Sequence, residues 1–173
     1  WDSPGARGGT RASVRGRNCN RFCAACDAAV IAARGAGTDT PGMDAITMLK
    51  ADHDKVKELL EQLDSTTERG VKRRTELFAT IKGELTVHEI IEEEIFYPAL
   101  KAHPKAKDIV LEGYEEHHVV DLLMGELEAL DVSDEAWGAK ATVMKENIEH
   151  HIEEEEGEMF RQARAVFDKD ELT

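Results

Sequence analysis

Two stretches of the sequence each hold a histidine followed four residues later by a glutamate: His88 with Glu92, and His151 with Glu155. Four residues are slightly more than one turn of an α-helix, so the two side chains of each pair project from the same face of their helix. An imidazole beside a carboxylate can exchange protons or bind a metal cation. Which chemistry applies depends on whether these helix faces are solvated or buried.

Both pairs continue an apolar stripe with the spacing of a helix face that packs in a protein core. The first stripe comprises Phe78, Ile81, Leu85, His88, Glu92 and Ile95. The second comprises Trp137, Ala141, Met144, Ile148, His151, Glu155 and Met159. We therefore expect two carboxylates inside a helical core, where an ionised carboxylate is costly unless a cation compensates for it. The two stripes predict metal binding.

Two further histidines, His53 and His117, lie in apolar stripes of their own. The stripe around His53 comprises Ile46, Leu49, Val56, Leu60 and Leu63. The stripe around His117 comprises Val110, Tyr114, Val120, Asp121, Met124 and Leu127. Counted from the turns that must join the helices, the four histidines lie about 14 to 18 residues away. At about 1.5 Å of rise per residue, these differences amount to a few ångströms, so we expect one histidine from each helix in a single layer.

The residue types in this layer define a candidate metal site. Its candidate ligands are His53, His88, Glu92, His117, Asp121, His151 and Glu155. Imidazole with carboxylate suits iron, manganese or zinc, and this number of ligands exceeds what one tetrahedral zinc uses. Because carboxylates can bridge two cations, we predict two irons per chain, with zinc or manganese as alternatives. If two carboxylates and one oxygen atom bridge two octahedral irons, and four imidazoles and one terminal carboxylate bind as well, about 11 of 12 positions are filled, which leaves one for a small ligand such as O2.

Several neighbouring residues leave alternatives open. Glu89 is adjacent to the first stripe and is a further candidate for metal contact. His118 and His150 lie one residue away from the stripes, so we expect them to be solvated or to support the ligands, and His150 could substitute for His151. His103 is expected to be exposed in a loop, and the acidic run 153–158 is expected to be a solvated face apart from Glu155.

The elements that must position these residues are four long helices. We predict helices over about 44–65, 71–103, 105–131 and 133–166, with Asp44 or Thr47 capping the first, Ser133 capping the last, and a short tail helix at 168–172. The connections between them are short, and short connections favour antiparallel neighbours. The predicted fold class is therefore all-α, an antiparallel up-down four-helix bundle.

Residues 1–42 differ in composition from the remainder. They contain six Arg, three Asp, no Lys and all three Cys, so their net charge is about +3 against −17 for residues 43–173. No helical period in them is long enough to bury a core, and Cys23-x-x-Cys26 lacks the second pair that a zinc site needs. We interpret 1–42 as a disordered or non-native extension, and 43–173, which begins at Met43, as a single domain.

Charge and hydropathy exclude some classes of partner. The formal net charge of −14 argues against binding to a nucleic-acid backbone, which needs clustered Lys and Arg. No run approaches the roughly 18 apolar residues that span a bilayer, so we expect no membrane partner. The folded part contains no cysteine, which fits a reducing compartment, and we predict a cytoplasmic protein.

The order and spacing of these motifs resemble the hemerythrin HHE cation-binding family. The resemblance rests on Asp52-His53, on His88-Glu89-x-x-Glu92-Glu93 before Phe96-Tyr97-Pro98, on Glu116-His117-His118, and on His151-x-x-x-Glu155-Glu156, and it covers about 43–167. It implies metal ligands at His53, His88, Glu92, His117, His151 and Glu155. Asp121 stands where hemerythrins proper have a second histidine in the third helix, and Arg161 stands where the last motif usually has a proline. The first departure weakens the case for an oxygen carrier.

The expected function is a non-haem, hemerythrin-type di-iron protein that binds or senses O2, another small oxidant or iron itself. The sequence has no nucleophile beside a base and no glycine loop for phosphate, which favours binding over turnover. Two alternatives stay open: a di-iron enzyme that reduces peroxide or O2, and a regulatory interaction module whose fold depends on the metal. The expected partners are metal ions and a small diatomic ligand or oxidant.

Overall fold

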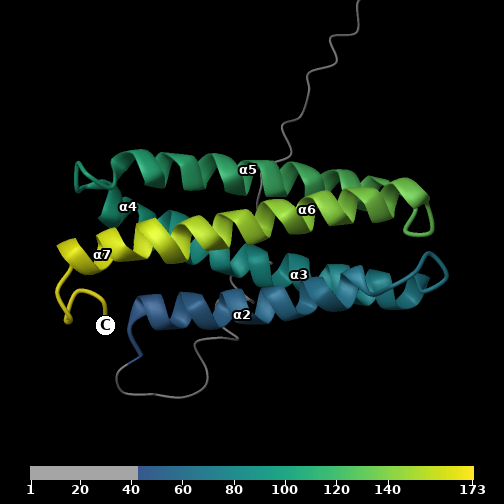
Figure 1. The fold of residues 1–173 in the computed structure, drawn as a ribbon, viewed down its shortest axis with the longest axis horizontal. Coiled ribbons are helices and arrows are strands. Elements are labelled where there is room, and N and C mark those ends of the chain that lie inside the picture. The colour runs from purple at the N-terminus through teal and green to yellow at the C-terminus, as the bar shows by residue number, and fades with distance from the viewer. Residues whose placement is uncertain (1–42) are drawn as a thin grey trace, which may run out of the picture. The chain divides into compact units, whose positions relative to one another are not determined.

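A computed structural model describes residues 43–173, so the interpretation of residues 1–42 lies outside the described part of the chain. The long helices are α2 (Ala45–Asp64), α3 (Val71–Ile91), α5 (Lys107–Ala129) and α6 (Glu135–Glu154). Shorter segments extend two of them: η1 (Glu92–Phe96) and α4 (Tyr97–Lys101) follow α3, and η2 (Glu155–Met159) and α7 (Phe160–Val166) follow α6. Turns join α2 to α3 and α5 to α6 at the same end of the molecule, on the right in Figure 1. The predicted all-α, antiparallel four-helix bundle is confirmed.

The helix starts differ from the prediction in one case. Asp44 caps α2, where its side chain accepts a hydrogen bond from the Thr47 amide at 2.9 Å. Asp134, and not Ser133, caps α6 by accepting from the Ala136 amide at 2.8 Å. The Ser133 hydroxyl is already engaged, because it donates to Asp131 Oδ1 at 2.6 Å. The predicted tail helix at 168–172 is also wrong, since these residues form turns.

Two groups of buried apolar side chains fill the bundle, one on each side of its middle. The turn-side core contains Val56, Leu60, Leu63, Leu77, Phe78, Ile81, Leu85, Val120, Met124, Leu127, Trp137, Ala141, Met144, Ile148 and Ile152. The tail-side core contains Ile46, Leu49, Phe96, Tyr97, Leu100, Ala106, Val110, Met159, Phe160 and Ala163. His53, His88 and His117 fall between these two cores in sequence, as His53 does between Leu49 and Val56. His151 lies at the border of the turn-side core, between Ile148 and Ile152.

Both helices with a His-x-x-x-Glu motif contain a π-helical turn that begins at the glutamate, η1 at Glu92 and η2 at Glu155. A π-turn accommodates one residue more than an α-turn and so rotates the following side chains around the helix. The predicted core position Ile95 is therefore wrong: Ile95 is 68% exposed, and Phe96 is buried instead. After α6, Met159 at the end of η2 and Phe160 at the start of α7 are both buried.

The buried face of α5 is also offset from the predicted stripe. It runs through Val110, Gly113, His117, Val120, Met124 and Leu127. Tyr114 and Asp121 lie on its flank and are partly buried. Gly113 is needed at this face because a Cβ atom there would come within 2.9 Å of the Tyr97 hydroxyl oxygen.

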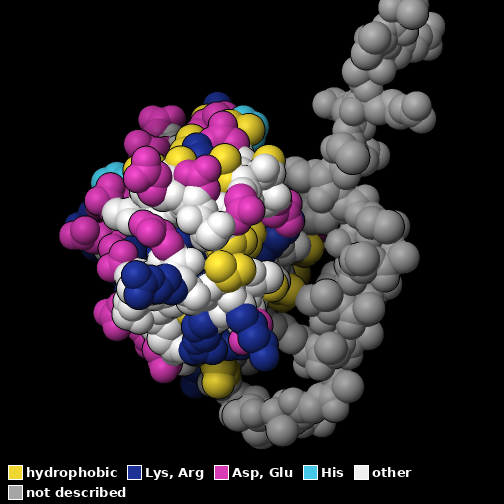
Figure 2. Space-filling view, turned by 90° about the vertical axis from the view of Figure 1, so that its right-hand side faces the viewer, with side chains coloured by type: hydrophobic (Ala, Val, Ile, Leu, Met, Phe, Trp, Pro, Cys, Tyr) yellow, Lys and Arg dark blue, Asp and Glu magenta, His cyan; other side chains and the backbone are white. Residues whose placement is uncertain are grey.

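None of the described helices is both long and apolar enough to cross a membrane. Figure 2 views the end of the bundle that holds the two turns. Acidic side chains are spread over this face, and the largest group of basic ones lies in its lower part.

Candidate metal centre

Four histidines meet in the middle of the bundle, one each from α2, α3, α5 and α6. All are buried, with relative exposures of 1% for His53, 3% for His88 and His117, and 6% for His151. They form two pairs: Nε2 of His53 lies 3.1 Å from Nε2 of His88, and Nε2 of His117 lies 3.2 Å from Nε2 of His151. The single layer of histidines expected from the sequence is therefore present.

Two buried carboxylates lie between the histidine pairs. Glu92 places Oε1 at 3.1 Å from His88 Nε2 and Oε2 at 3.2 Å from His117 Nε2. Glu155 Oε2 lies 3.1 Å from His53 Nε2 and 3.9 Å from His151 Nε2. Each carboxylate thus reaches both pairs, and both are buried, at 0% and 1% exposure. A π-turn begins at each of these two glutamates.

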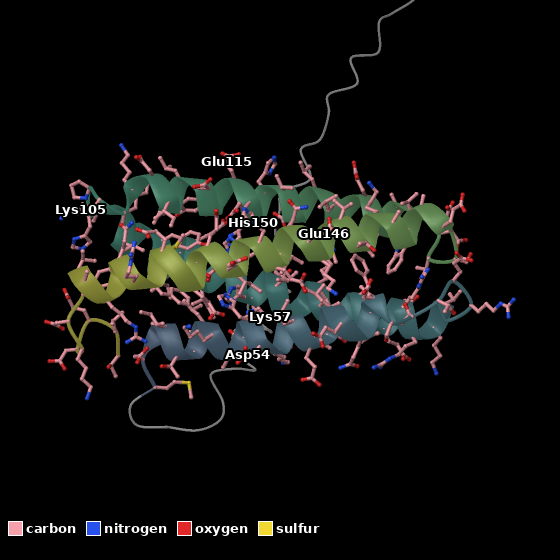
Figure 3. The ribbon with its side chains drawn as sticks, viewed as in Figure 1. Asp54, Lys57, Lys105, Glu115, Glu146 and His150 are labelled. Atoms are coloured by element: carbon pink, nitrogen blue, oxygen red, sulfur yellow. The ribbon has the colours of Figure 1, made fainter. Side chains whose placement is uncertain are left out.

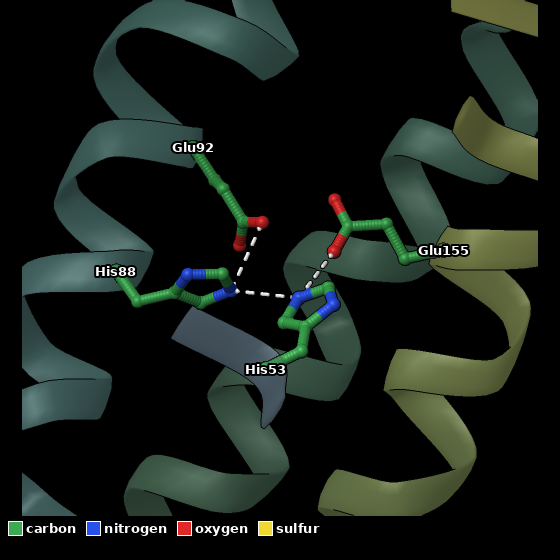
Figure 4. A group of neighbouring side chains, drawn as sticks. All are labelled: His53, His88, Glu92 and Glu155. Atoms are coloured by element: carbon green, nitrogen blue, oxygen red, sulfur yellow. Dashed lines mark hydrogen bonds and ion pairs between the residues drawn. The ribbon is translucent and has the colours of Figure 1, made fainter. Parts of the chain in front are cut away.

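These contacts form two groups of ligand atoms that could each hold a metal ion. One group contains His53, His88, Glu92 and Glu155, which converge in Figure 4, and the other contains Glu92, His117 and His151. Glu92 belongs to both groups and can therefore bridge two cations. Asp121, the remaining predicted ligand, is in neither group and is only partly buried.

The outer nitrogen of each histidine faces a carboxylate from a different helix. Nδ1 of His53 lies 3.0 Å from Glu156, Nδ1 of His117 lies 3.2 Å from Glu93, and Nδ1 of His151 lies 2.8 Å from Glu116. The fourth contact is longer, at 3.8 Å between Nδ1 of His88 and Asp52. The four contacts run from α2 to α3, from η1 to α5, from α5 to α6 and from η2 back to α2. We call this closed set Asp52, Glu93, Glu116 and Glu156 the outer carboxylate ring.

The outer carboxylate ring fixes the chemistry of the inner nitrogens. A carboxylate accepts hydrogen bonds, so in His53, His117 and His151 the proton of a neutral imidazole belongs on Nδ1, which donates to the ring. Nε2 then presents its lone pair to the centre, as a metal ligand must. We assign these tautomers from the hydrogen-bonding partners of Nδ1. Nδ1 of His88, 3.8 Å from Asp52, is beyond hydrogen-bond distance.

The electrostatic field at the centre is strongly negative. Burial alone would lower the pKa of His88, but Glu92, Asp52 and Glu155 outweigh it and raise that pKa well above its usual value. For His117, burial again opposes the charged form, but Glu92 and Glu93 raise the pKa to about 10. A field that holds protons on buried imidazoles also favours cations at the same nitrogens.

The pKa values of the two central carboxyl groups shift in opposite directions. Burial opposes ionisation of Glu92, but His88 and His117 hold its pKa well below the usual range. Burial and the charge of Glu92 together raise the pKa of Glu155. Two carboxylates this close repel each other when both are ionised, and a bound cation removes that repulsion.

The hydrogen bonding of the two central carboxylates gives a second reason, independent of charge, to expect a metal cation. All four oxygens of Glu92 and Glu155 are buried, and none accepts a hydrogen bond within the described chain. Buried carboxylate oxygens normally accept hydrogen bonds. Because these four accept none and converge with imidazole lone pairs, they are placed to bind a metal cation instead of a hydrogen-bond donor. Oxygen and imidazole ligands suit iron, manganese or zinc.

Tyr97 borders the centre, although it was not among the site residues predicted from the sequence. Its side chain is fully buried, its ring stacks on the His117 ring with centroids 5.4 Å apart, and its hydroxyl oxygen lies 3.4 Å from His117 Nε2. Burial, together with the charges of Glu92 and Glu155, raises the pKa of Tyr97 well above its usual value, so the phenol keeps its proton. The hydroxyl is thus a hydrogen-bond donor at the edge of the site.

Two of the three histidines outside the centre have the exposure that was expected from the sequence. His118 is exposed. His150, labelled in Figure 3, is also exposed, and it forms a peripheral group with Glu116 and Glu154 on the surface. His103 is only partly exposed, because its ring packs edge-on against Phe167 at 5.3 Å. Glu89 is 8% exposed and lines the same small cavity as the four histidines.

The outer carboxylate ring is what sequence reasoning missed. Its members are direct sequence neighbours of ligand positions: Asp52 precedes His53, Glu93 follows Glu92, Glu116 precedes His117 and Glu156 follows Glu155. Glu156 lies in the run expected to be solvated, yet it bonds to His53 and pairs with Lys50 at 2.8 Å. The sequence signal that could have identified the ring is an acidic residue directly beside a predicted ligand at four separate places.

Comparison with known proteins agrees with this geometry. The family model described as the hemerythrin HHE cation binding domain matches residues 44–163. The chain is also 26% identical over 141 residues to a protein called DNA nickase from Nostoc sp. (strain PCC 7120 / SAG 25.82 / UTEX 2576). That match covers 82% of this chain but only 39% of the length of the relative. No solved structure gave a significant match.

The matched residues contain both His-x-x-x-Glu motifs and all four central histidines. The buried His and Glu cluster fits a role in metal binding. The chain belongs to the hemerythrin HHE cation-binding domain family.

Proposed function

We propose that this domain holds two iron ions between its four histidines and uses them to bind or sense a small oxidant such as O2. The observation that supports two ions best is the bridging position of Glu92, whose two oxygens face different histidine pairs. Each pair then supplies two imidazoles to one ion, and Glu155 reaches both. Bound iron of this kind supplies reversible binding or reduction of a small oxidant.

The space beside the centre supports a diatomic or similarly small ligand. A cavity of about 20 Å³ lies against the four histidines and is walled by Val56, Leu85, Val120, Ile148 and Ile152, together with Glu89. This volume is enough for one molecule the size of water. Apart from the histidines and Glu89 the walls are apolar, which favours a small, weakly polar ligand. The small volume leaves no room for an organic substrate.

An alternative function is an enzyme that reduces peroxide or O2 at the same centre. One feature favours it: Glu89 puts a buried carboxyl group in the wall of the cavity, where reduction of an oxidant would need protons. Binding and turnover differ in whether reductant is consumed.

The similarity to a DNA nickase raises the possibility of a role beside nucleic acid, and we propose that this domain is not the part that contacts it. Residues 43–173 carry a net charge of −17, which repels a phosphate backbone. A regulatory role, in which this metal-binding domain is attached to a separate activity or cooperates with one, is consistent with the acidic surface. It is also consistent with the match, which covers only 39% of the length of the relative.

Anaerobic reduction followed by addition of O2 tests the main proposal. Purified, iron-loaded protein should contain about two irons per chain. We expect a visible absorption band that appears with O2 and disappears when O2 is removed. One zinc and no iron would contradict the di-iron proposal, and continuous consumption of reductant would favour the enzyme.

A further inference from the structure

A second cavity opens at the turn end of the bundle, apart from the metal centre. It has a volume of about 150 Å³, and its inner walls come from Leu60, Leu63, Trp137 and Ala141 of the turn-side core. Arg74 completes the buried wall. Asp64, Gly138, Thr142 and Lys145 form the rest of its lining, so the cavity is apolar on its inner side and polar at its rim. Its volume is that of a cavity that holds a benzene-sized group.

Arg74 is the unusual member of this wall. Its side chain is only 7% exposed, and no carboxylate in residues 43–173 forms an ion pair with it. Nε donates to Thr66 Oγ1 at 3.0 Å and Nη1 donates to the Val132 carbonyl at 3.2 Å, while the guanidinium carbon lies 5.3 Å from the Trp137 ring centroid. These neutral partners position the guanidinium but leave its positive charge without a counter-ion. An uncompensated buried charge is costly, so the site favours an anion.

The other charged groups at the cavity do not supply that anion. Lys145 lines the rim and lies 3.5 Å from Asp64 and 3.8 Å from Glu149, so the rim charges are already paired with one another. The indole nitrogen of Trp137, fully buried in the same wall, has no hydrogen-bond partner within the described residues. Asp64, the carboxylate that lines this cavity, is therefore already paired with Lys145, and within the described residues neither the Arg74 guanidinium nor the Trp137 indole nitrogen has a carboxylate partner.

We propose that this cavity binds a small monocarboxylate with an apolar body. The body packs on Leu60, Leu63 and Trp137, and the carboxylate pairs with the Arg74 guanidinium, whose planar fork suits a carboxylate. Binding here is independent of the metal centre, which lies between the two cores. The ligand would be recognised by shape and one charge, as in most small-molecule pockets.

The probe is sodium benzoate, and the reporter is Trp137. The chain has two tryptophans, Trp1 and Trp137, so a Trp1→Phe background leaves a single fluorophore in the cavity wall. Titration of the full chain with benzoate at constant ionic strength should give a saturable change in Trp137 fluorescence, with a dissociation constant on the order of 1 mM for so small a ligand.

Three analogues separate the contributions. Benzyl alcohol keeps the ring and lacks the charge, acetate keeps the charge and lacks the ring, and inorganic phosphate is a different anion. We expect each to bind at least about tenfold more weakly than benzoate. Equal binding of benzyl alcohol would reduce the site to an apolar cavity, and equal or tighter binding of phosphate would overturn the carboxylate assignment.

Two variants test the location. Ala141→Leu fills the cavity without altering Arg74, and Arg74→Met removes the charge; each should weaken benzoate binding about tenfold or more. Arg73→Met, at the exposed neighbouring residue, is the matched control and should bind as before. If Arg74→Met does not fold, the benzoate affinity of Ala141→Leu and the affinities of the analogues still test the proposal. Unchanged affinity in Ala141→Leu would overturn the proposal, because it would place benzoate elsewhere, for example on the metal ions.

Discussion

Glu92 holds its two carboxylate oxygens against histidines of two different helices, Oε1 at 3.1 Å from His88 Nε2 and Oε2 at 3.2 Å from His117 Nε2. A carboxylate in this position can join two cations, whereas a histidine can hold only one through Nε2. The relationship makes Glu92 the residue on which the number of bound metals depends most directly.

Replacing Glu92 with alanine should therefore cost more metal than any single histidine substitution. We expect Glu92→Ala to lower bound metal from about two ions per chain to one or fewer, because both positions lose a ligand. The measurement is metal content by elemental analysis after dialysis. Glu94→Ala, at an exposed position of the same π-turn, is the control and should retain the full content. Equal loss in both variants would mean that the acidic run binds metal nonspecifically.

The outer carboxylate ring should strengthen metal binding, although its carboxylates do not face the centre. Glu116 accepts from His151 Nδ1 at 2.8 Å, which fixes the orientation of the imidazole and strengthens it as a ligand. Glu116→Gln should weaken metal binding about 10- to 100-fold, since substitution of such supporting partners typically has this effect. Competition with a chelator of known affinity measures the change.

The exposed neighbour Glu115 provides the matched control for this substitution. Glu115 projects from α5 away from the centre, as Figure 3 shows, and Glu115→Gln removes the same charge from the same helix. If the two variants lose affinity equally, the effect of Glu116 is a general one of net charge and not of hydrogen bonding to His151.

Sequence periodicity predicted the four central histidines because an α-helix repeats regularly. The stripes through His53, His88, His117 and His151 keep steps of three and four residues up to the centre. The prediction fails at Ile95, within the π-turn that begins at Glu92, because an added residue in one turn changes the register and leaves no mark in hydropathy.

Other positions could not be assigned from a single helix. Both Asp121 and Val120 continue a stripe from His117, and only the packing of α5 on its neighbours buries Val120 and leaves Asp121 on the flank. Similarly, Glu156 stands in an acidic run typical of a solvated face. Its contact with His53 depends on where α2 lies beside η2, which the pattern within η2 cannot reveal.

Gly113 should be intolerant of a side chain because of Tyr97. A Cβ atom there would lie 2.9 Å from the Tyr97 hydroxyl and 3.2 Å from Met159 Cε, so Gly113→Ala should lower the free energy of unfolding by about 1–3 kcal/mol through overpacking. Denaturant unfolding measures it. Gly125→Ala, in the same helix with no atom within 4 Å of the added Cβ, should instead stabilise by roughly 0.5–1 kcal/mol.

The Tyr97 hydroxyl can be tested in the same series. Tyr97→Phe removes the closest atom to the added Cβ, so the double variant Gly113→Ala with Tyr97→Phe should recover part of the lost stability. Strict additivity of the two substitutions would show that the hydroxyl does not occupy the position described.

The Asp44 cap gives a pH-dependent prediction. A hydrogen bond from the Thr47 amide is the main cause that lowers the pKa of Asp44 below its usual value. A carboxylate with a depressed folded-state pKa stabilises the fold above its unfolded pKa, near 3.9, and loses that contribution as pH falls through the folded-state value. Asp44→Ala should thus cost about 0.5–2 kcal/mol at pH 7 and less in acid, whereas Asp44→Asn, a neutral cap, should show little change with pH. Unfolding at pH 7 and pH 3 measures the difference.

Removal of the metal should loosen the middle of the bundle more than its ends. The centre brings buried carboxylates and imidazoles together between two apolar cores, and the cores themselves consist of apolar side chains, which bind no cation. Ligand binding to the folded state alone adds about 4 kcal/mol when the free metal exceeds its dissociation constant 1,000-fold, so chelation should lower the melting temperature by several degrees. Hydrogen exchange should accelerate most in the segments around His53, His88, His117 and His151, and least around Trp137 and Leu77 in the turn-side core. Uniform acceleration along all four helices would mean that the bundle folds only with its metal, and no acceleration at the four histidines would mean that they do not hold it.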